Sequence, residues 1–381
     1  MSVEWGAAAA DSSEAARQEE VAGALHVLPL DEANSKLLAQ VHPLTHINPQ
    51  PQAVYNMVVL GAGAGGLVTA AQCAKRGAKV ALVECNLLGG DCLNSGCVPS
   101  KALISCAKHI KYARQKVSST FGIRIKGGDS AIEVDFAAIM ARMRRLRADI
   151  AAADSVTRFR DSLGVDVFIG RGKFVGNGQL RVEANGQDPV TLKFKKACIA
   201  SGGKPFVPDI EGLAQVPYYT NETIFNLTQL PARIGVIGTG PIGCELAQAF
   251  TYFGSKVTVF GRSPQPLRRE DPEAAQVLLA QLRKDGVDFV TGVTYDRVSK
   301  SGSGQEVTVH YSTKERGAET AVVDVLLVAA GRAPNVDGQG FESVGVEFDR
   351  HGVKVDDFLQ TKNPNMYVWF DCRGCYYVAS R

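Results

Sequence analysis

Two cysteines five positions apart mark the part of the sequence best suited to chemistry. Cys92 and Cys97 lie in the run GGDCLNSGCVPSK. In a regular helix, residues five apart are separated by about 7.5 Å along the axis, beyond the Cα separation of about 7 Å that a disulfide tolerates. Asn94, Gly96 and Pro99 favour a bend or a delayed helix that brings the sulfurs together. The run therefore predicts reversible thiol–disulfide chemistry.

The charge next to this pair favours a reactive thiolate. Lys101 follows Cys97 by one helical turn, and a thiolate near a helix N-terminus and a lysine has a lowered pKa. The alternative, small buried side chains, suits other cysteines of the chain better. These are Cys73, Cys85, Cys106, Cys198 and Cys244. Nine cysteines, an odd number without a secretory signal, predict a reducing compartment in which any disulfide is catalytic.

The elements that must supply electrons to this pair precede and follow it as a repeat. Residues 56–60 predict a buried strand, followed by the turn GAGAGG, a helix, and a second strand over 79–83. The order returns with a strand at 233–237, the turn GTGPIG, a helix, and a strand at 256–260. A glycine turn between a strand and a helix binds a dinucleotide pyrophosphate at the helix N-terminus. The glycines are Gly61, Gly63 and Gly66 in the first copy and Gly238, Gly240 and Gly243 in the second.

The two copies differ where the ribose is recognised. Glu84 lies 23 residues after Gly61 and can accept hydrogen bonds from ribose hydroxyls, which suits FAD or NAD. The equivalent residue of the second copy is Gly261, and basic side chains follow it. These are Arg262, Arg268 and Arg269. Guanidinium groups favour a 2′-phosphate and therefore NADPH over NADH. The alternatives are surface arginines and glycine turns that bind no ligand.

The cysteine run, with both glycine turns, resembles the flavin-dependent pyridine nucleotide–disulfide oxidoreductases of class I, and within them the mercuric-reductase-like branch. The resemblance covers residue 53 to the end. It implies that Cys97 is the charge-transfer sulfur next to the flavin and that Cys92 is the interchange thiol. It also implies that Glu245 pairs with Lys101, and that residues 329–335 form the return crossing between domains. The FAD-binding residues implied are Gly61, Gly63, Gly66, Glu84, Gly90, Asp91, Lys101 and Asp371, with Gly331 as a further cofactor-binding residue.

Two features depart from the family pattern. The family's Tyr-Ala-x-Gly-Asp run reads YVWFD here, and Phe370 replaces a glycine that lets backbone approach the cofactor. The family continues into an interface domain that forms a homodimer and supplies a catalytic histidine, whereas this sequence stops at Arg381. We expect that domain to be absent. A truncated, catalytically impaired FAD- and NAD(P)-binding protein therefore stands as the alternative to a working enzyme.

Composition excludes other classes of function. A net charge of +3 with mixed signs gives no broad case for nucleic acid or membrane binding. The basic run 142–147 is interpreted as the solvated face of a helix. No signal peptide or membrane span is seen, which favours a cytoplasmic location. Cys372 and Cys375 form a C-x-x-C that is interpreted as incidental, so no metal site is predicted.

These observations predict an α/β fold of two Rossmann-like domains, one for FAD and one for NAD(P), one inserted in the other. The predicted organisation is an N-terminal extension over 1–52, an FAD domain over 53–205 and 329–381, and an NAD(P) domain over 206–328. The predicted enzyme passes electrons from NADPH through flavin to the Cys92–Cys97 disulfide. Its substrate is a small-molecule or protein disulfide, or thiol-bound Hg(II).

Overall fold

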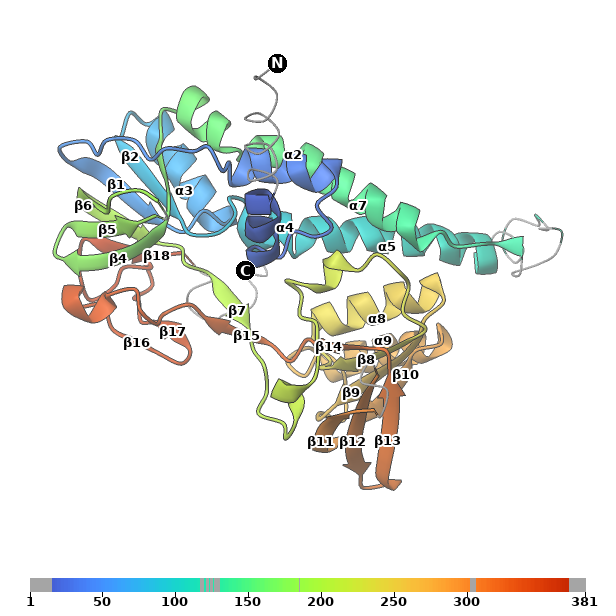
Figure 1. Cartoon of the computed structure of the whole chain (residues 1–381). Helices are drawn as coiled ribbons and strands as arrows, with labels where there is room; N and C mark the ends of the chain where they lie inside the picture. Colours follow the sequence, from blue (N-terminus) through green and yellow to red (C-terminus); the bar gives the residue numbers. More distant parts are fainter. Residues whose placement is uncertain are drawn as a thin grey trace, which may run out of the picture. The chain divides into compact units, whose positions relative to one another are not determined.

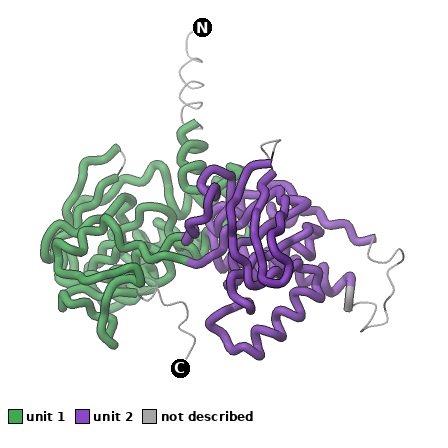
Figure 2. The backbone as a smooth tube through the Cα atoms, turned by 90° about the horizontal axis from the view of Figure 1, so that it is seen from below, with its two compact units in different colours: residues 1–94, 144–204, 332–381 green, residues 95–143, 205–331 purple. Residues whose placement is uncertain are grey.

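The computed structural model describes residues 16–116, 120, 123, 126, 131–184, 186–301 and 306–369. Internal contacts divide the chain into two compact units, coloured separately in Figure 2. Unit 1 comprises residues 1–94, 144–204 and 332–381, and unit 2 comprises residues 95–143 and 205–331. The predicted α/β fold, with one unit inserted in the sequence of the other, is confirmed. Residues 95–143, placed with the FAD domain from the sequence, group with unit 2 by contacts.

Helices of both units are labelled in Figure 1. They are α2 (Glu32–Val41), α3 (Ala64–Lys75), α4 (Gly90–Asn94), α5 (Cys97–Lys111), α7 (Phe136–Ile150), α8 (Pro241–Phe253) and α9 (Pro272–Lys284). Their ends follow from local chemistry. Asp31 and Asp271 cap α2 and α9 by accepting hydrogen bonds from N–H groups of the first turn. Glycines precede α3 and α8 without a side-chain cap, which leaves N–H groups of those helices available to a ligand.

Unit 1 is built on a parallel sheet with the strand order β3-β2-β1-β6, extended by β18 beside β6. The antiparallel strands β5 and β4 continue it from the first half of β6. Helix α3 packs against β1, β2 and β6, and the buried strands form one apolar core. The strands are β1 (Tyr55–Leu60), β2 (Val80–Glu84), β3 (Asp166–Ile169), β4 (Arg171–Gly176), β5 (Gln179–Glu183), β6 (Val190–Ile199), β16 (Phe348–Asp349), β17 (Gly352–Val353) and β18 (Met366–Val368).

Unit 2 repeats this plan with a parallel sheet of order β10-β9-β8-β14 and an antiparallel sheet of order β11-β12-β13. Helix α5 packs against α8, the helix that follows the second glycine turn. The strands are β8 (Arg233–Ile237), β9 (Lys256–Gly261), β10 (Asp288–Thr291), β11 (Thr294–Lys300), β12 (Val307–Thr313), β13 (Gly317–Val323) and β14 (Val325–Val328). Strands β7 (Gly203–Pro205) and β15 (Arg332–Pro334) pair where the chain leaves unit 1 and returns to it.

The N-terminal extension predicted over residues 1–52 contains helices, although its prolines signal turns. Residues 16–24 and α2 are helical, and Leu37, Leu38 and Val41 of α2 are buried. The Val41 carbonyl accepts a hydrogen bond from the Leu88 N–H at 3.1 Å. The apolar face of α2 thus packs on unit 1, because burial of that face outweighs the turn signals of the flanking prolines.

The basic run of α7 also differs from the solvated face that was expected. Arg144 and Arg147 are buried, at 7% and 2% exposure, while Arg142 and Arg145 are exposed. Both buried guanidinium groups bond to the N-terminal segment. Among the described helices, none is long and apolar enough to cross a membrane.

Candidate active site

The two predicted redox cysteines lie on either side of a break between helices. Helix α4 ends at Asn94, and α5 begins at Cys97, with Gly96 at the non-helical angles φ −139° and ψ −109°. The interruption predicted from the asparagine and glycine is therefore confirmed. Cys92 is half-buried on α4, and Cys97 is exposed as the first residue of α5. A thiolate at this first position faces the positive end of the α5 dipole.

The start of α4 is joined directly to the first glycine turn within unit 1. The Gly89 N–H donates to the Ala62 carbonyl at 2.9 Å, and a parallel bridge pairs Gly63 with Gly89. A Cβ on Gly90 would lie 2.6 Å from the Gly63 Cα. Side chains are excluded at this junction, so the helix carrying Cys92 starts against the turn predicted to hold a pyrophosphate.

The three glycines of the first turn differ in the space that a side chain would find there. A Cβ on Gly61 would lie 2.2 Å from the Ala200 carbonyl oxygen, and one on Gly66 would lie 1.8 Å from the Gly61 carbonyl oxygen. A Cβ on Gly63 would meet nothing closer than the Gly90 Cα, at 3.8 Å. Gly61 and Gly66 are thus required by the fold, whereas the space at Gly63 remains for a ligand to approach backbone.

Glu84 ends β2 and is buried with its carboxylate already bonded to this turn. It accepts from the Ala62 N–H at 2.6 Å and from the Asn86 N–H at 2.7 Å. Burial raises the pKa of Glu84, and these N–H donors oppose the shift. Cys85 also donates hydrogen bonds to this carboxylate, so the Glu84 side chain is held at the edge of the first turn by three residues.

The second glycine turn repeats the first one contact for contact. A Cβ on Gly238 would lie 2.3 Å from the Ala329 carbonyl oxygen, and one on Gly243 would lie 2.4 Å from the Gly238 carbonyl oxygen. A Cβ on Gly240 would meet nothing within 4 Å. Both turns therefore offer open backbone at their middle glycine, as dinucleotide binding requires.

The copies diverge at the ribose position, as predicted, and the structure adds a reason. A Cβ on Gly261 would lie 2.6 Å from Cγ2 of Thr239, the residue equivalent to Ala62 of the first turn. The Thr239 methyl group takes the place that a carboxylate side chain would need. Sequence reasoning missed this residue, although the difference between Ala62 and Thr239 in the repeat was a usable signal. The arginines that follow, Arg262, Arg268 and Arg269, are exposed.

Two ion pairs involve predicted site residues, each within one unit. In unit 2, Lys101 Nζ lies 2.9 Å from each carboxylate oxygen of Glu245. In unit 1, Arg332 donates to the carboxylate of Asp91 and to the Gly203 carbonyl. Arg332 directly follows Gly331, whose carbonyl accepts from the Phe206 N–H at 2.9 Å. Arg332 was not among the predicted site residues.

The end of β18 lies against the first turn in an unexpected way. The Trp369 N–H donates to the Ile199 carbonyl at 2.9 Å, and a Cβ on Gly65 would lie 2.1 Å from the Trp369 indole ring. The half-buried indole thus covers the first turn of α3 at Gly65. Asp371 and Phe370, like Cys372 and Cys375, lie outside the described residues.

Comparison with known proteins gives these features a family. The family model of pyridine nucleotide-disulphide oxidoreductases matches residues 55–380. The chain belongs to this family. It is 33% identical to the mercuric reductase of Lysinibacillus sphaericus over 89% of its own length and 60% of that protein. It is 31% identical to the dihydrolipoyl dehydrogenase of Chlamydia muridarum over 85% of its own length and 67% of that protein.

A solved structure from the family has a similar fold. The HOCl-induced flavoprotein disulfide reductase RclA from Escherichia coli, in its Cu(II) complex, is 29% identical with a TM-score of 0.73. The match covers 85% of this chain and 67% of that one. The chain spans 60–67% of the length of these three relatives.

Members of the pyridine nucleotide-disulphide oxidoreductase family use FAD and NAD(P)H. The residues present in this chain fit both groups. Each glycine turn leaves room where a pyrophosphate would lie, and each is followed by a helix whose N-terminus has no side-chain cap. The buried carboxylate of Glu84 suits the first turn to the FAD adenosine, and its absence at Gly261 distinguishes the second.

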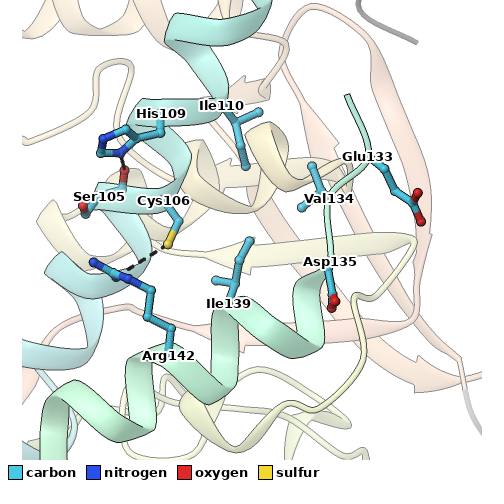
Figure 3. Close-up of a pocket in the computed structure, with 9 residues that line it drawn as sticks. All are labelled: Ser105, Cys106, His109, Ile110, Glu133, Val134, Asp135, Ile139 and Arg142. Atoms are coloured by element: carbon cyan, nitrogen blue, oxygen red, sulfur yellow. Dashed lines mark hydrogen bonds between the residues drawn. The ribbon is translucent and has the colours of Figure 1, made fainter. Parts of the chain in front are cut away.

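A cavity of about 480 Å³ lies apart from the predicted site residues (Figure 3). It is formed by α5 and the start of α7, and Cys106 Sγ lies 3.7 Å from Nη1 of Arg142 within it. Ile110, Val134 and Ile139 make its wall apolar. Among the described residues, no group of histidine, cysteine and carboxylate side chains is arranged to hold a metal.

Proposed function

We propose that the chain is an FAD-dependent oxidoreductase that passes electrons from NADPH to a Cys92–Cys97 disulfide and then to a substrate. The observation that carries this proposal is the junction of Gly63 with Gly89 and Gly90. It starts the helix that carries Cys92 directly at the turn that suits the FAD pyrophosphate. Electron transfer to a disulfide requires this proximity of the flavin and sulfur sites.

When bound, FAD would supply the step that converts a hydride from the nicotinamide into two electrons for a disulfide. The protein's own residues would stabilise the charges. Cys97 begins α5, where the helix dipole favours a thiolate. Lys101 lies one turn later, and Glu245 fixes its ammonium group at 2.9 Å. We assign Cys97 as the sulfur next to the flavin and Lys101 with Glu245 as the charge pair beside it.

Cys92 is proposed to react with the substrate. Its thiolate would attack a disulfide RSSR, form a mixed disulfide, and release RS⁻. Attack by Cys97 would then release the second RS⁻ and restore the Cys92–Cys97 disulfide, so that two electrons pass to RSSR. The printed names of the relatives include disulfide reductase, dihydrolipoyl dehydrogenase and mercuric reductase. A small-molecule or protein disulfide is the proposed substrate, with thiol-bound Hg(II) as the alternative.

The purified full chain tests this proposal directly. We expect a yellow protein with bound FAD, bleached by NADPH without oxygen, that reduces a dye with NADPH as donor. A colourless protein that binds no added FAD would refute the proposed FAD-dependent activity. It would favour the alternative of an impaired nucleotide-binding protein, which the indole beside Gly65 would explain. A disulfide and Hg²⁺ panel would then distinguish the substrates.

The second turn predicts a coupled change of nucleotide preference. Glutamate at Gly261 should be accommodated only when the Thr239 side chain is shortened, because the two overlap. We expect Thr239→Ala with Gly261→Glu to recreate the arrangement of Ala62 and Glu84, and to shift the NADPH/NADH ratio of kcat/KM toward NADH by about tenfold or more. Dye reduction with each nucleotide measures this ratio.

The single variants provide the control for that double variant. Gly261→Glu alone should weaken the binding of both NADPH and NADH, because its clash with Thr239 displaces the glycine turn that both nucleotides use. Thr239→Ala alone should leave the preference for NADPH in place. An equal preference for both nucleotides in the unmodified chain would contradict the assignment of the arginines to a 2′-phosphate.

A further inference from the structure

A buried arginine connects the N-terminal helix α2 to the helix that carries Cys92. Arg147 is 2% exposed, and its Nη1 donates to the backbone carbonyl of Asn94 at 2.7 Å. Its Nη2 donates to Oδ1 of Asn34 at 2.7 Å, and Asn34 is fully buried on α2. All three residues belong to unit 1. One guanidinium group therefore joins a residue outside the family match to the last residue of α4.

Burying the charged guanidinium group of Arg147 costs free energy. Desolvation, together with the charge of Arg144, lowers the pKa of Arg147 to about 10, although the carboxylate of Asp31 opposes that shift. Arg147 bonds to neutral acceptors rather than to a carboxylate, and its Nε has no hydrogen-bond partner among the described residues. A buried cation without a direct counter-ion destabilises the fold, so packing stability does not account for it.

The group that Arg147 holds is the end of α4. The last carbonyls of a helix have no partner within the helix and must find one elsewhere. Arg147 provides that partner at Asn94, and Nδ2 of Asn94 reaches back to the carbonyls of Leu88 at 3.1 Å and Gly90 at 2.9 Å. Asn94 thus ties the end of α4 to its beginning. Cys92, two residues earlier, lies between the two ends of α4 that these hydrogen bonds join. We call these hydrogen bonds of Asn94 and Arg147 the clamp.

The chain beyond the clamp is held in the same way. The next carbonyl, that of Ser95, accepts a hydrogen bond from Nδ2 of Asn221 at 3.3 Å within unit 2. The carbonyls of Asn94 and Ser95 are therefore each bonded to a buried side chain of their own unit.

We propose that Arg147 is a positioning residue for the redox pair, and that α2 acts on this pair through Asn34 and Arg147. This inference depends on the proposed function, in which Cys92 and Cys97 form a disulfide. By fixing the Asn94 carbonyl, Arg147 restrains the end of α4, two residues after Cys92. Loss of that restraint makes the disulfide less favourable relative to the two thiols.

The disulfide equilibrium of the full chain tests the inference. The chain is equilibrated with mixtures of reduced and oxidised dithiothreitol, alkylated, and analysed by mass spectrometry of the peptide containing both cysteines. In this exchange the two thiols give two electrons and two protons to the cyclic disulfide. We expect Arg147→Lys to reduce the oxidised-to-reduced ratio about tenfold, which corresponds to an increase of about 30 mV in the midpoint potential.

The partner residue on α2 gives a second, milder variant. Asn34→Ala should shift the ratio in the same direction by a smaller factor, because Arg147 keeps its bond to Asn94. The double variant should shift it no further than Arg147→Lys does, because both residues act in one chain of contacts. Independent, additive shifts would contradict a route from α2 through Arg147.

Arg144→Lys is the matched control. Arg144 lies on the same helix, is also buried, and bonds to Asp31 of the same N-terminal segment at 2.6 Å, but it is not bonded to Asn94. We expect the oxidised-to-reduced ratio of Arg144→Lys to equal that of the unmodified chain. Equal shifts for Arg144→Lys and Arg147→Lys would overturn the inference. If Arg147→Lys fails to fold, an unchanged ratio in Asn34→Ala overturns it. Failure of the unmodified chain to form the disulfide in any mixture refutes the proposed function itself.

Discussion

Replacing Cys92 with serine is expected to abolish disulfide reduction, by roughly a thousandfold or more, while NADPH still reduces the bound flavin. Serine is close in size to cysteine but forms neither a thiolate at neutral pH nor a bond to a substrate sulfur. Cys97, the assigned partner of the flavin, is unchanged in this variant. NADPH oxidation in the presence of a disulfide substrate measures the loss of disulfide reduction. Anaerobic bleaching of the flavin by NADPH measures the flavin reduction that is retained.

Cys106→Ser is the matched control, since it makes the same chemical change on α5, the helix that Cys97 begins. Cys106 lies in the cavity of Figure 3 next to Arg142, and it is outside the proposed electron path. We expect its disulfide turnover to match that of the unmodified chain. Loss of flavin reduction in Cys92→Ser would contradict the role given to Cys92. Equal losses in both variants would indicate a general effect of replacing cysteine with serine and not a role specific to Cys92.

The features that could be predicted from the sequence are those fixed by local backbone geometry. Gly96 interrupts the helix between the cysteines, and the two glycine turns place their first and third glycines against neighbouring carbonyls. The first and third glycines of each turn demand one residue type because any side chain there would collide with backbone. The same demand, repeated in both copies at the same spacing, made the two nucleotide units visible without a structure.

The features that could not be predicted depend on partners distant in the sequence. The burial of Arg147 depends on Asn34, more than a hundred residues earlier, and a helical pattern alone assigns such an arginine to solvent. The indole of Trp369 meets Gly65 from the far end of unit 1. No spacing rule links these positions. Helices α2 and α7 bring Asn34 and Arg147 together, and the pairing of β18 with β6 places Trp369.

Replacing Gly66 with alanine is expected to remove bound FAD and to destabilise unit 1. The added Cβ would lie 1.8 Å from the Gly61 carbonyl oxygen, so α3 and β1 must separate. Overpacking against backbone costs about 3 kcal/mol, which lowers the unfolding temperature of a unit of this size by roughly 6–12 °C. Flavin absorbance after gel filtration and thermal unfolding of the flavin-free protein measure the two effects separately.

Gly63→Ala separates ligand binding from folding at the same turn. Its Cβ would meet nothing nearer than the Gly90 Cα at 3.8 Å, and its φ of −71° suits alanine. We expect the flavin-free protein to unfold at an unchanged temperature, while FAD binds about tenfold more weakly or worse, because the methyl group displaces a charged pyrophosphate from backbone donors. Unchanged FAD affinity in this variant would show that the pyrophosphate does not lie at Gly63. The turn would then be structural, and its junction with Gly89 would no longer connect a flavin to Cys92.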